Sequence, residues 1–317
     1  MSVFAFHPTL APYARDITLT ADGTLLRAHV YDSALVDADA ARKPVALLVH
    51  GLNDDADTWR HVFVPLARDF RVIAPDLPGF GRSYKPGRPY TIAFFRETLL
   101  ALMDALEVPA ATLIGNSMGA MICQALSLDA PTRVQRLILV CGALILRQQP
   151  LTWDMVRRAL PVFQRKVEDK SASFRRDPQA AYALLRPYYA DFDALSAQDQ
   201  HFLLDRVRDR VWDDAQFEAY RSVWQHLPVW FLFNRAELRA QIAASRVDTH
   251  VAWGEADTIF SVEHAEAQIE VNPAIHLVMI PAAGHLPQQE QPEAFLRAIG
   301  FERLAHDLGD PGPLGDA

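Results

Sequence analysis

The sequence lacks the features of several common protein classes. Only two of its 317 residues are cysteines, Cys123 and Cys141, so a fold held by disulfides is not expected and a reducing compartment is favoured. The net charge is -8, with no basic excess that would attract nucleic acid or an anionic membrane. The longest apolar runs reach about half of a bilayer crossing. No basic segment followed by a long apolar one opens the sequence, so no signal peptide is expected.

Apolar residues make up 50% of the sequence and charged residues 22%, which suits one large globular domain, with or without an insertion. We therefore expect a soluble, cytoplasmic protein that exists as a monomer or a homodimer. It should bind no nucleic acid and have no membrane span.

Strand and helix patterns alternate through the first half of the sequence. A hairpin is predicted over residues 15–31, because two alternating segments flank Asp22-Gly23-Thr24. Buried strands are predicted over residues 44–50, 70–75, 111–115 and 134–142. Helices are predicted over residues 58–68, 91–106 and 117–130. This alternation favours an α/β fold, with a mostly parallel, twisted sheet flanked by helices.

The alternation stops in the middle of the chain. Residues 143–245 carry helical segments rich in aromatic side chains and no buried strand pattern. The alternation then resumes with strands predicted over residues 249–253 and 275–280 and helices over residues 261–270 and 292–304. We interpret residues 143–245 as a helical cap inserted into a core made of residues 1–142 and 246–317. A separate helical domain is disfavoured, because the sheet needs strands from both flanks.

The shortest junction between a strand and a helix lies at residues 115–119, Gly-Asn-Ser-Met-Gly. A chain that turns from strand to helix in so few residues strains the central residue, Ser117, and favours glycine two positions before and after it. The Ser117 hydroxyl would then stand at the sheet edge beside the first amides of a helix. The sequence therefore favours a serine nucleophile over a serine that only caps the helix.

A serine hydroxyl needs a base to take its proton, and the base needs a third group to orient it. Asp257 and His285 each follow a predicted strand. Because the carboxyl ends of parallel strands open on one edge of a sheet, Ser117, Asp257 and His285 can converge there in the chain order serine, acid, histidine. Glu255 is the rival acid, and Asp257 could instead cap the following turn.

Hydrolysis at a carbonyl also needs two donors for the developing oxyanion. The backbone N–H of Met118, at the start of the helix, is the predicted first donor. The N–H of Leu52, which follows another strand end, is the predicted second. His50 is expected to brace this loop rather than react, and the Asn53 amide could either reach the oxyanion or lie exposed.

These motifs together resemble the α/β-hydrolase superfamily over residues 18–305. The matching pieces are His50-Gly51, the turn-rich residues 76–83, residues 115–119, Gly254-x-x-Asp257 and Gly284-His285. The resemblance implies the α/β-hydrolase fold with Ser117 as nucleophile, Asp257 as acid and His285 as base. No cofactor and no metal are expected.

Asn116 and Met118, beside the serine, resemble the corresponding residues of the meta-cleavage-product hydrolases, which cleave carbon–carbon bonds. The chain departs from that group in two places. Residues 52–55 are Leu-Asn-Asp-Asp where the group is glycine-rich, and Leu286 stands where the group tends to carry tryptophan. A cap arginine also belongs to that group, and the sequence does not identify which cap arginine would correspond to it.

An aromatic-rich cap over the strand ends favours an apolar or aromatic small-molecule substrate. We therefore expect a serine hydrolase that cleaves a carboxylic ester through an acyl-serine intermediate. The alternative is a carbon–carbon bond hydrolase acting on a ring meta-cleavage product. An alternative of another class is a ligand receptor or signalling protein on the same fold.

Three further segments have simpler interpretations. Asp76 is expected to brace its own loop. Residues 205–210 alternate in charge and are expected to form a solvated helix face. The apolar run over residues 227–233 could line a pocket, pack the cap onto the core or form a dimer contact.

Overall fold

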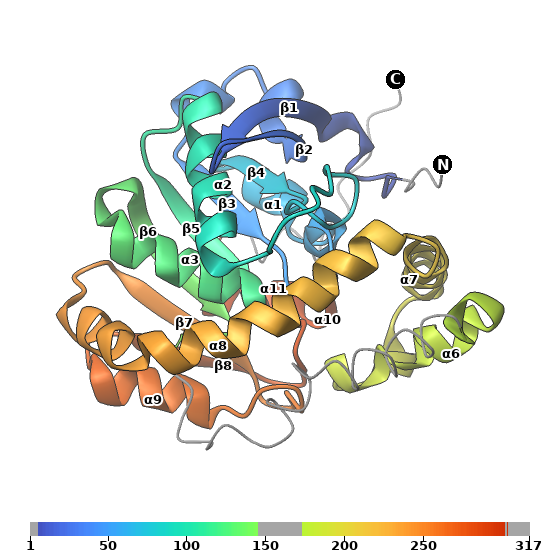
Figure 1. The fold of residues 1–317 in the computed structure, drawn as a ribbon. Helices are drawn as coiled ribbons and strands as arrows, with labels where there is room; N and C mark the ends of the chain where they lie inside the picture. The colour runs from blue at the N-terminus through green and yellow to red at the C-terminus, as the bar shows by residue number, and fades with distance from the viewer. Residues whose placement is uncertain (1–5, 145–172, 302, 304–317) are drawn as a thin grey trace.

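The computed structural model describes residues 6–144, 173–301 and 303 (Figure 1). Residues 145–172 of the predicted cap and the end of the last predicted helix lie outside these described residues. The strands are β1 (Ala14–Ala21), β2 (Thr24–Asp32), β3 (Val45–Val49), β4 (Arg71–Pro75), β5 (Ala111–Asn116), β6 (Val134–Val140), β7 (Thr249–Gly254) and β8 (His276–Ile280). The helices are α1 (Phe63–Ala67), α2 (Ile92–Ala105), α3 (Met118–Asp129), α6 (Pro178–Ala183), α7 (Ala197–Arg210), α8 (Asp214–Ala244), α9 (Glu263–Val271), α10 (Pro287–Glu290) and α11 (Pro292–Ala298).

Within the described residues, the strands form one sheet in the order β1-β2-β4-β3-β5-β6-β7-β8. β2 pairs antiparallel with β1 and β4, and every later pair is parallel. The predicted hairpin is confirmed: Asp22 and Gly23 both have positive φ angles, 46° and 69°, which suit a two-residue turn. The mostly parallel sheet predicted from the alternation of elements is likewise confirmed.

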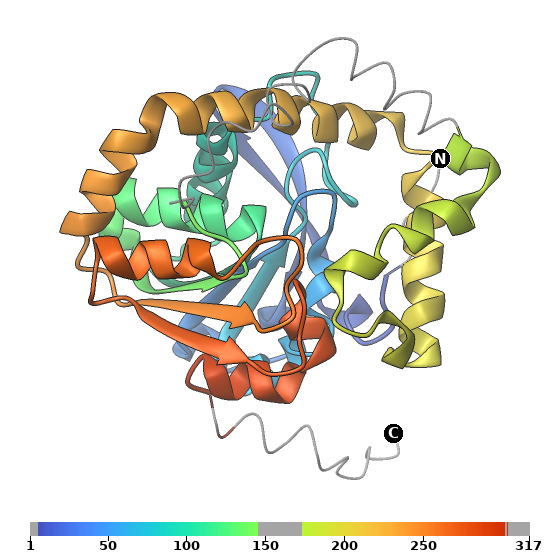
Figure 2. The same ribbon diagram turned by 90° about the horizontal axis from the view of Figure 1, so that it is seen from below.

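The helices cover both faces of this sheet. Figure 1 shows α2 and α3 in front of it, with α1 and α11 behind. The central strand β5 is buried at every position, as the continuous apolar run predicts for a strand covered on both faces. In Figure 2, β7 and β8 point toward the helices α6 and α7. The parallel strands therefore end at the side of the molecule on which these helices lie.

The helix predicted over residues 58–68 forms as two shorter pieces. A 3-10 turn covers Ala56–Trp59, and the α-helix α1 begins only at Phe63. Pro65 explains the late start, because proline has no N–H and is tolerated only in the first turn of a helix. At the other end of the chain, α11 stops at Ala298, two residues before Gly300, whose φ of 85° is left-handed.

The solvated helix face predicted over residues 205–210 is wrong. Arg206 is 2% exposed, and its guanidinium pairs with Asp55 at 2.7 Å and with Asp57 at 3.3 Å. Arg210, one helical turn later, pairs with Asp55 at 3.0 Å. Only the other face of α7 is exposed, where Arg208 pairs with Asp205. Positions 206 and 210 share one face of a helix, which the alternation of charge along the sequence does not show.

Arg82 joins the same set of charges from the core. Its guanidinium contacts Asp76 at 2.8 Å, Asp57 at 2.9 Å and the Tyr31 hydroxyl at 2.6 Å. We call Asp55, Asp57, Asp76, Arg82 and Arg206 the rim charge cluster. Asp76 also accepts the backbone N–H groups of Ala56 and Arg82, so the prediction that Asp76 braces its loop is confirmed.

Replacing Arg82 with alanine is expected to lower the free energy of unfolding by about 3–5 kcal/mol. The change leaves buried carboxylates without their cation, and removing one partner of a buried ion pair has a cost of that size. Urea unfolding followed by fluorescence measures the change. The control is Arg297→Ala, which removes an exposed pair with Glu293 and should leave the urea midpoint nearly unchanged. Equal stability of the two variants would contradict the prediction.

Asp76, within the rim charge cluster, is also expected to contribute less stability in acid. Burial alone would raise the pKa of Asp76, but the Arg82 guanidinium outweighs it and lowers the pKa from 3.8 to about 2. A carboxyl with a lowered folded-state pKa stabilises the fold above pH 3.8 and loses that contribution as the pH falls toward 2, by about 2 kcal/mol in all. Urea midpoints measured between pH 5 and pH 2 should fall more steeply for the wild-type chain than for Arg82→Ala.

The apolar run over residues 227–233 lies within α8 and divides between two environments. Leu227, Trp230 and Phe231 pack against the main core. Val229, Leu232 and Phe233 are exposed. The first three confirm packing as a role of this run. No helix in the described residues is both long enough and apolar enough to span a membrane.

Candidate active site

Ser117 stands at the junction of β5 and α3 in a strained conformation. Its φ of 55° and ψ of -117° lie outside the regions that non-glycine residues usually adopt. Side chains at the two flanking glycines are excluded, because a Cβ at Gly115 would collide with the carbonyl of Gly119, and one at Gly119 with that of Val49. Ser117 makes no side-chain hydrogen bond to the helix it precedes. Helix capping therefore does not explain this serine.

His285 and Asp257 form a buried pair. The distance between His285 Nδ1 and Asp257 Oδ2 is 2.9 Å, and their side chains are 2% and 1% exposed. The other carboxylate oxygen, Oδ1, accepts the backbone N–H groups of Ile259 at 2.8 Å and Phe260 at 3.0 Å. The Asp257 carboxylate is thus held in one orientation toward the imidazole. The rival acid, Glu255, is exposed.

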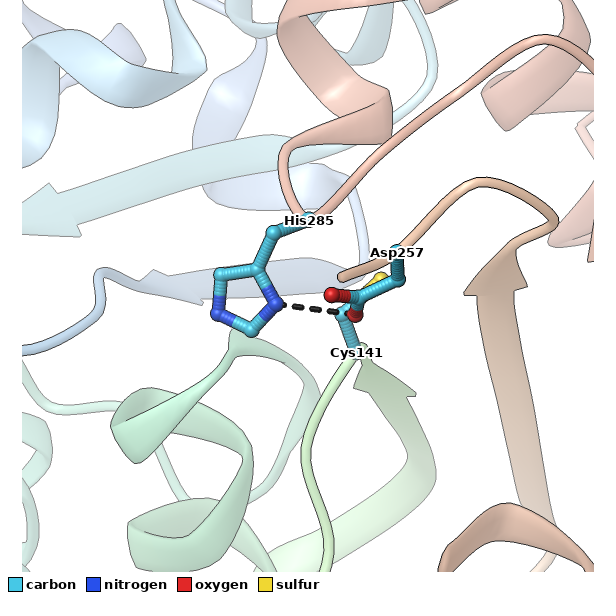
Figure 3. A group of neighbouring side chains, drawn as sticks. All are labelled: Cys141, Asp257 and His285. Carbon is cyan, nitrogen blue, oxygen red and sulfur yellow. Dashed lines mark hydrogen bonds and ion pairs between the residues drawn. The ribbon is translucent and has the colours of Figure 1, made fainter. Parts of the chain in front are cut away.

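This pairing determines which nitrogen of His285 can act as a base. A carboxylate only accepts hydrogen bonds, so in the neutral ring Nδ1 carries the proton and Nε2 has a free lone pair. Within the described residues, Nε2 is buried and has no hydrogen-bond partner. Figure 3 shows Asp257 beside the Nδ1 edge of the ring and Nε2 turned away from it.

The elbow that carries Ser117 is clamped to the loop that carries His285. The Asn116 side chain donates from Nδ2 to the carbonyl of His285 at 3.0 Å and to that of Val140 at 3.2 Å. The Ser117 N–H also donates to Val140, at 2.8 Å. In the sequence, Asn116 is distinguished only because it resembles the corresponding residue of a family motif. Its positioning contact joins residues 169 apart, which no local pattern reveals.

The loop of the predicted second oxyanion donor lies against this elbow. A Cβ at Gly51 would lie 3.2 Å from Ser117 Cβ, so Leu52 follows a residue in close contact with the serine. Neither Leu52 nor Met118 donates its backbone N–H to an acceptor in the described part of the chain. His50 braces the loop, as predicted. Its Nδ1 contacts the carbonyl of Gly51, and its Nε2 accepts the N–H of Leu77, both at 2.8 Å.

Cys141 completes the group drawn in Figure 3. Its sulfur accepts the Gly254 N–H at 3.4 Å, which places it close to Asp257. Among the described residues, Cys141, Asp257 and His285 form one group whose ligand atoms lie within 4.8 Å of one another, close enough for a metal ion. Burial and the Asp257 carboxylate raise the pKa of the Cys141 thiol well above its usual value, whereas metal binding needs the thiolate. These residues therefore suit an acid–base pair better than a metal centre. That no metal is required stays a prediction.

Residues of the predicted cap contact the loops that carry His285 and Asp257. His285 donates its backbone N–H to the carbonyl of Tyr188 at 2.8 Å, and the Thr258 hydroxyl donates to Pro187 at 2.8 Å. Glu290, in α10, joins the two regions, because its carboxylate accepts the N–H groups of Gly284 at 2.7 Å and Ala190 at 2.6 Å. Sequence reasoning missed Glu290, since nothing in a local pattern separates it from a surface glutamate.

Aromatic rings flank the imidazole. The ring of Phe260 lies 5.5 Å from that of His285, and the ring of Tyr188 lies 5.7 Å from it. The His285 ring thus contacts one ring from the core and one from the predicted cap. Such surroundings suit an apolar ligand.

Comparison with known proteins identifies the family. Residues 44–292 match the family described as the alpha/beta hydrolase fold. The chain belongs to this family. The matched range includes all five predicted site residues: Leu52, Ser117, Met118, Asp257 and His285.

Several relatives of this α/β-hydrolase have named activities. This chain is 28% identical over 273 residues to a 2-hydroxymuconate semialdehyde hydrolase from Pseudomonas sp. strain CF600. The alignment covers 80% of this chain and 84% of that relative. The fold of this chain is similar to that of a 2-hydroxy-6-oxo-6-phenylhexa-2,4-dienoate hydrolase from Rhodococcus sp. strain RHA1, with a TM-score of 0.69 and 21% identity. The match covers 90% of this chain and 98% of that structure. A thermophilic esterase from Thermogutta terrifontis also has a similar fold, with a TM-score of 0.67 and 23% identity. The match covers 94% of this chain and 100% of that structure.

Proposed function

We propose that this α/β-hydrolase is a serine hydrolase that cleaves a carboxylic ester of a mostly apolar or aromatic small molecule. The observation that carries the proposal is the buried His285–Asp257 pair next to the strained backbone at Ser117. His285 Nε2 has no hydrogen-bond partner among the described residues, and Asn116 joins the His285 loop to the residue before Ser117. The aromatic rings of Tyr188 and Phe260 in contact with His285 support an apolar substrate.

In the proposed reaction, Ser117 Oγ attacks the ester carbonyl while His285 Nε2 takes its proton. Asp257 stabilises the imidazolium that forms, and the N–H groups of Met118 and Leu52 hold the oxyanion. The imidazolium then protonates the leaving alcohol. Water attacks the acyl-serine with the same base, which releases the acid and restores the hydroxyl.

A fluorophosphonate probe tests the nucleophile. We expect rapid, stoichiometric labelling of Ser117, identified by peptide mass spectrometry, together with turnover of a short p-nitrophenyl ester. An unreactive serine in a folded chain would contradict the proposal and favour the ligand receptor or signalling protein, which could retain the fold without a working nucleophile.

Carbon–carbon bond hydrolysis is the second candidate, and the similarity to the 2-hydroxymuconate semialdehyde hydrolase favours it. Leu286, where the meta-cleavage-product hydrolases tend to carry tryptophan, favours the ester instead. Comparing kcat/KM for a p-nitrophenyl ester with that for a dienoate ring-cleavage product separates the two. A much higher value for the dienoate would overturn the choice of ester while leaving Ser117 as the nucleophile.

A further inference from the structure

A buried glutamine of α8 reaches the loop that carries the proposed second oxyanion donor. Gln216 lies in the first turn of α8 and is 1% exposed. Its amide nitrogen, Nε2, donates to Asn53 Oδ1 at 3.1 Å. Its amide oxygen, Oε1, accepts the backbone N–H of Gly81 at 3.0 Å. Both ends of the amide are thus used to join α8 to two loops of the core.

Asn53 is the residue directly after Leu52, and its backbone is left-handed, with φ at 57°. Its hydrogen bond with Gln216 is the only one it makes within the described residues. This contact ties the Asn53 side chain to α8. The N–H of Leu52 belongs to the preceding peptide of the same short loop.

The rest of the loop is fixed independently at its two ends. At the first end, Gly51 packs against Ser117. At the second end, Asp55 is buried and paired with Arg206 and Arg210 of α7. Leu52 and Asn53 lie between these two anchors, and Leu52 itself is partly exposed. In this middle part His50 Nδ1 contacts the Gly51 carbonyl and Arg210 pairs with Asp54, while Gln216 is the side chain that contacts Asn53.

We propose that Gln216 is a positioning residue that sets the Leu52 N–H toward the oxyanion through its hydrogen bond to Asn53. The inference rests on the proposed function, because it assigns Gln216 a role in the same reaction. In this role, the first turn of α8 supports the oxyanion hole from the predicted cap, in addition to any role of the cap in covering the substrate.

Two single variants and their combination test this role. Asn53→Gly removes the amide that Gln216 contacts, while glycine retains the left-handed backbone without strain. This variant leaves the Gln216–Gly81 hydrogen bond in place, so it isolates the contact with the loop. Gln216→Leu removes the contact from the other side with a side chain of similar size. Gln241→Leu is the matched control, since Gln241 lies near the far end of the same helix and contacts only Glu237 among the described residues.

The readouts are kcat per fluorophosphonate-labelled site, KM for a p-nitrophenyl ester, and the inhibition constant of a trifluoromethyl ketone. The serine hydroxyl adds to the ketone carbonyl. The oxyanion that results lies where the oxyanion of the ester reaction would form. We expect kcat to fall about tenfold to a hundredfold in both single variants, with KM unchanged, because a displaced donor weakens only the transition state. Ketone affinity should fall by the same factor, and the double variant should be no worse than the worse single one.

A merely structural role for Gln216 would lower the number of labelled sites without changing kcat per site. That result, unchanged ketone affinity, or fully additive effects in the double variant would overturn the inference. A wild-type chain that neither labels at Ser117 nor hydrolyses the ester would overturn the proposed function and this inference with it. A wild-type chain that does both, beside variants with unchanged kcat, would overturn the inference alone.

Discussion

Replacing Ser117 with alanine is expected to lower kcat for a p-nitrophenyl ester by about 10⁶-fold, since the loss of a serine nucleophile has an effect of that size in serine hydrolases. The fold should be retained, because the hydroxyl makes no hydrogen bond to the helix that it precedes. Steady-state kinetics measures the loss, and circular dichroism checks the fold. Fluorophosphonate labelling should disappear in the same variant. Residual turnover near the wild-type rate would exclude Ser117 as the nucleophile.

Ser117→Gly is the informative companion to this variant. Glycine adopts positive φ angles at no steric cost, whereas serine at φ 55° is strained. The glycine variant should therefore be as inactive as the alanine variant but more resistant to urea, with a gain of about 1 kcal/mol. A chain that gains stability while it loses all activity would show that the strain serves the nucleophile rather than the fold. Equal urea midpoints for alanine and glycine would contradict that interpretation.

Asp257→Asn is expected to reduce kcat by about 10⁴-fold with little change in KM. The amide can present an N–H to the ring instead of an acceptor, which favours the tautomer with the proton on Nε2 and removes the base. The carboxylate also stabilises the imidazolium formed during attack, and an uncharged amide cannot.

Glu255→Gln is the matched control for this variant. Glu255 lies two residues earlier and carries the same charge, but it is exposed, so its replacement should leave kcat and KM unchanged. If Glu255→Gln lost activity and Asp257→Asn kept it, the acid would have been assigned to the wrong residue. Unfolding of Asp257→Asn would be detected by its urea midpoint, since Oδ1 also holds the turn at Ile259 and Phe260.

The elbow at Ser117 could be predicted because its causes are local. An apolar strand, two glycines and a helical segment follow one another within a few residues, and the strained backbone angles agree with that expectation. The parallel sheet could be predicted for the same kind of reason, since most positions of each buried strand are apolar and the strands alternate with helical segments. Helix ends were less accurate, as α1 shows, because one proline decided where the helix could begin.

The choice between Asp257 and Glu255 shows where local reasoning stops. Both carboxylates follow the same strand, and in the sequence Asp257 is favoured only by the resemblance of Gly254-x-x-Asp257 to the family pattern. The difference lies in burial and in partners: Asp257 is oriented by two amides and bonded to His285, whereas Glu255 is exposed. The boundaries of the cap, residues 143–245, stay a prediction.

Arg206 and Gln216 show the limit most clearly. Along the chain, Arg206 belongs to an alternating run of charges and Gln216 to an ordinary polar helix start, yet both are buried against a loop more than 150 residues earlier. By itself the sequence determined the local geometry at Ser117 and the alternation of strands and helices along the chain, since both depend on neighbouring residues. Only the tertiary structure decided which charges are buried and which helix contacts the loop at Asn53. Those contacts depend on which faces meet after folding, and the cost of burying an unpaired polar group then fixes the partners.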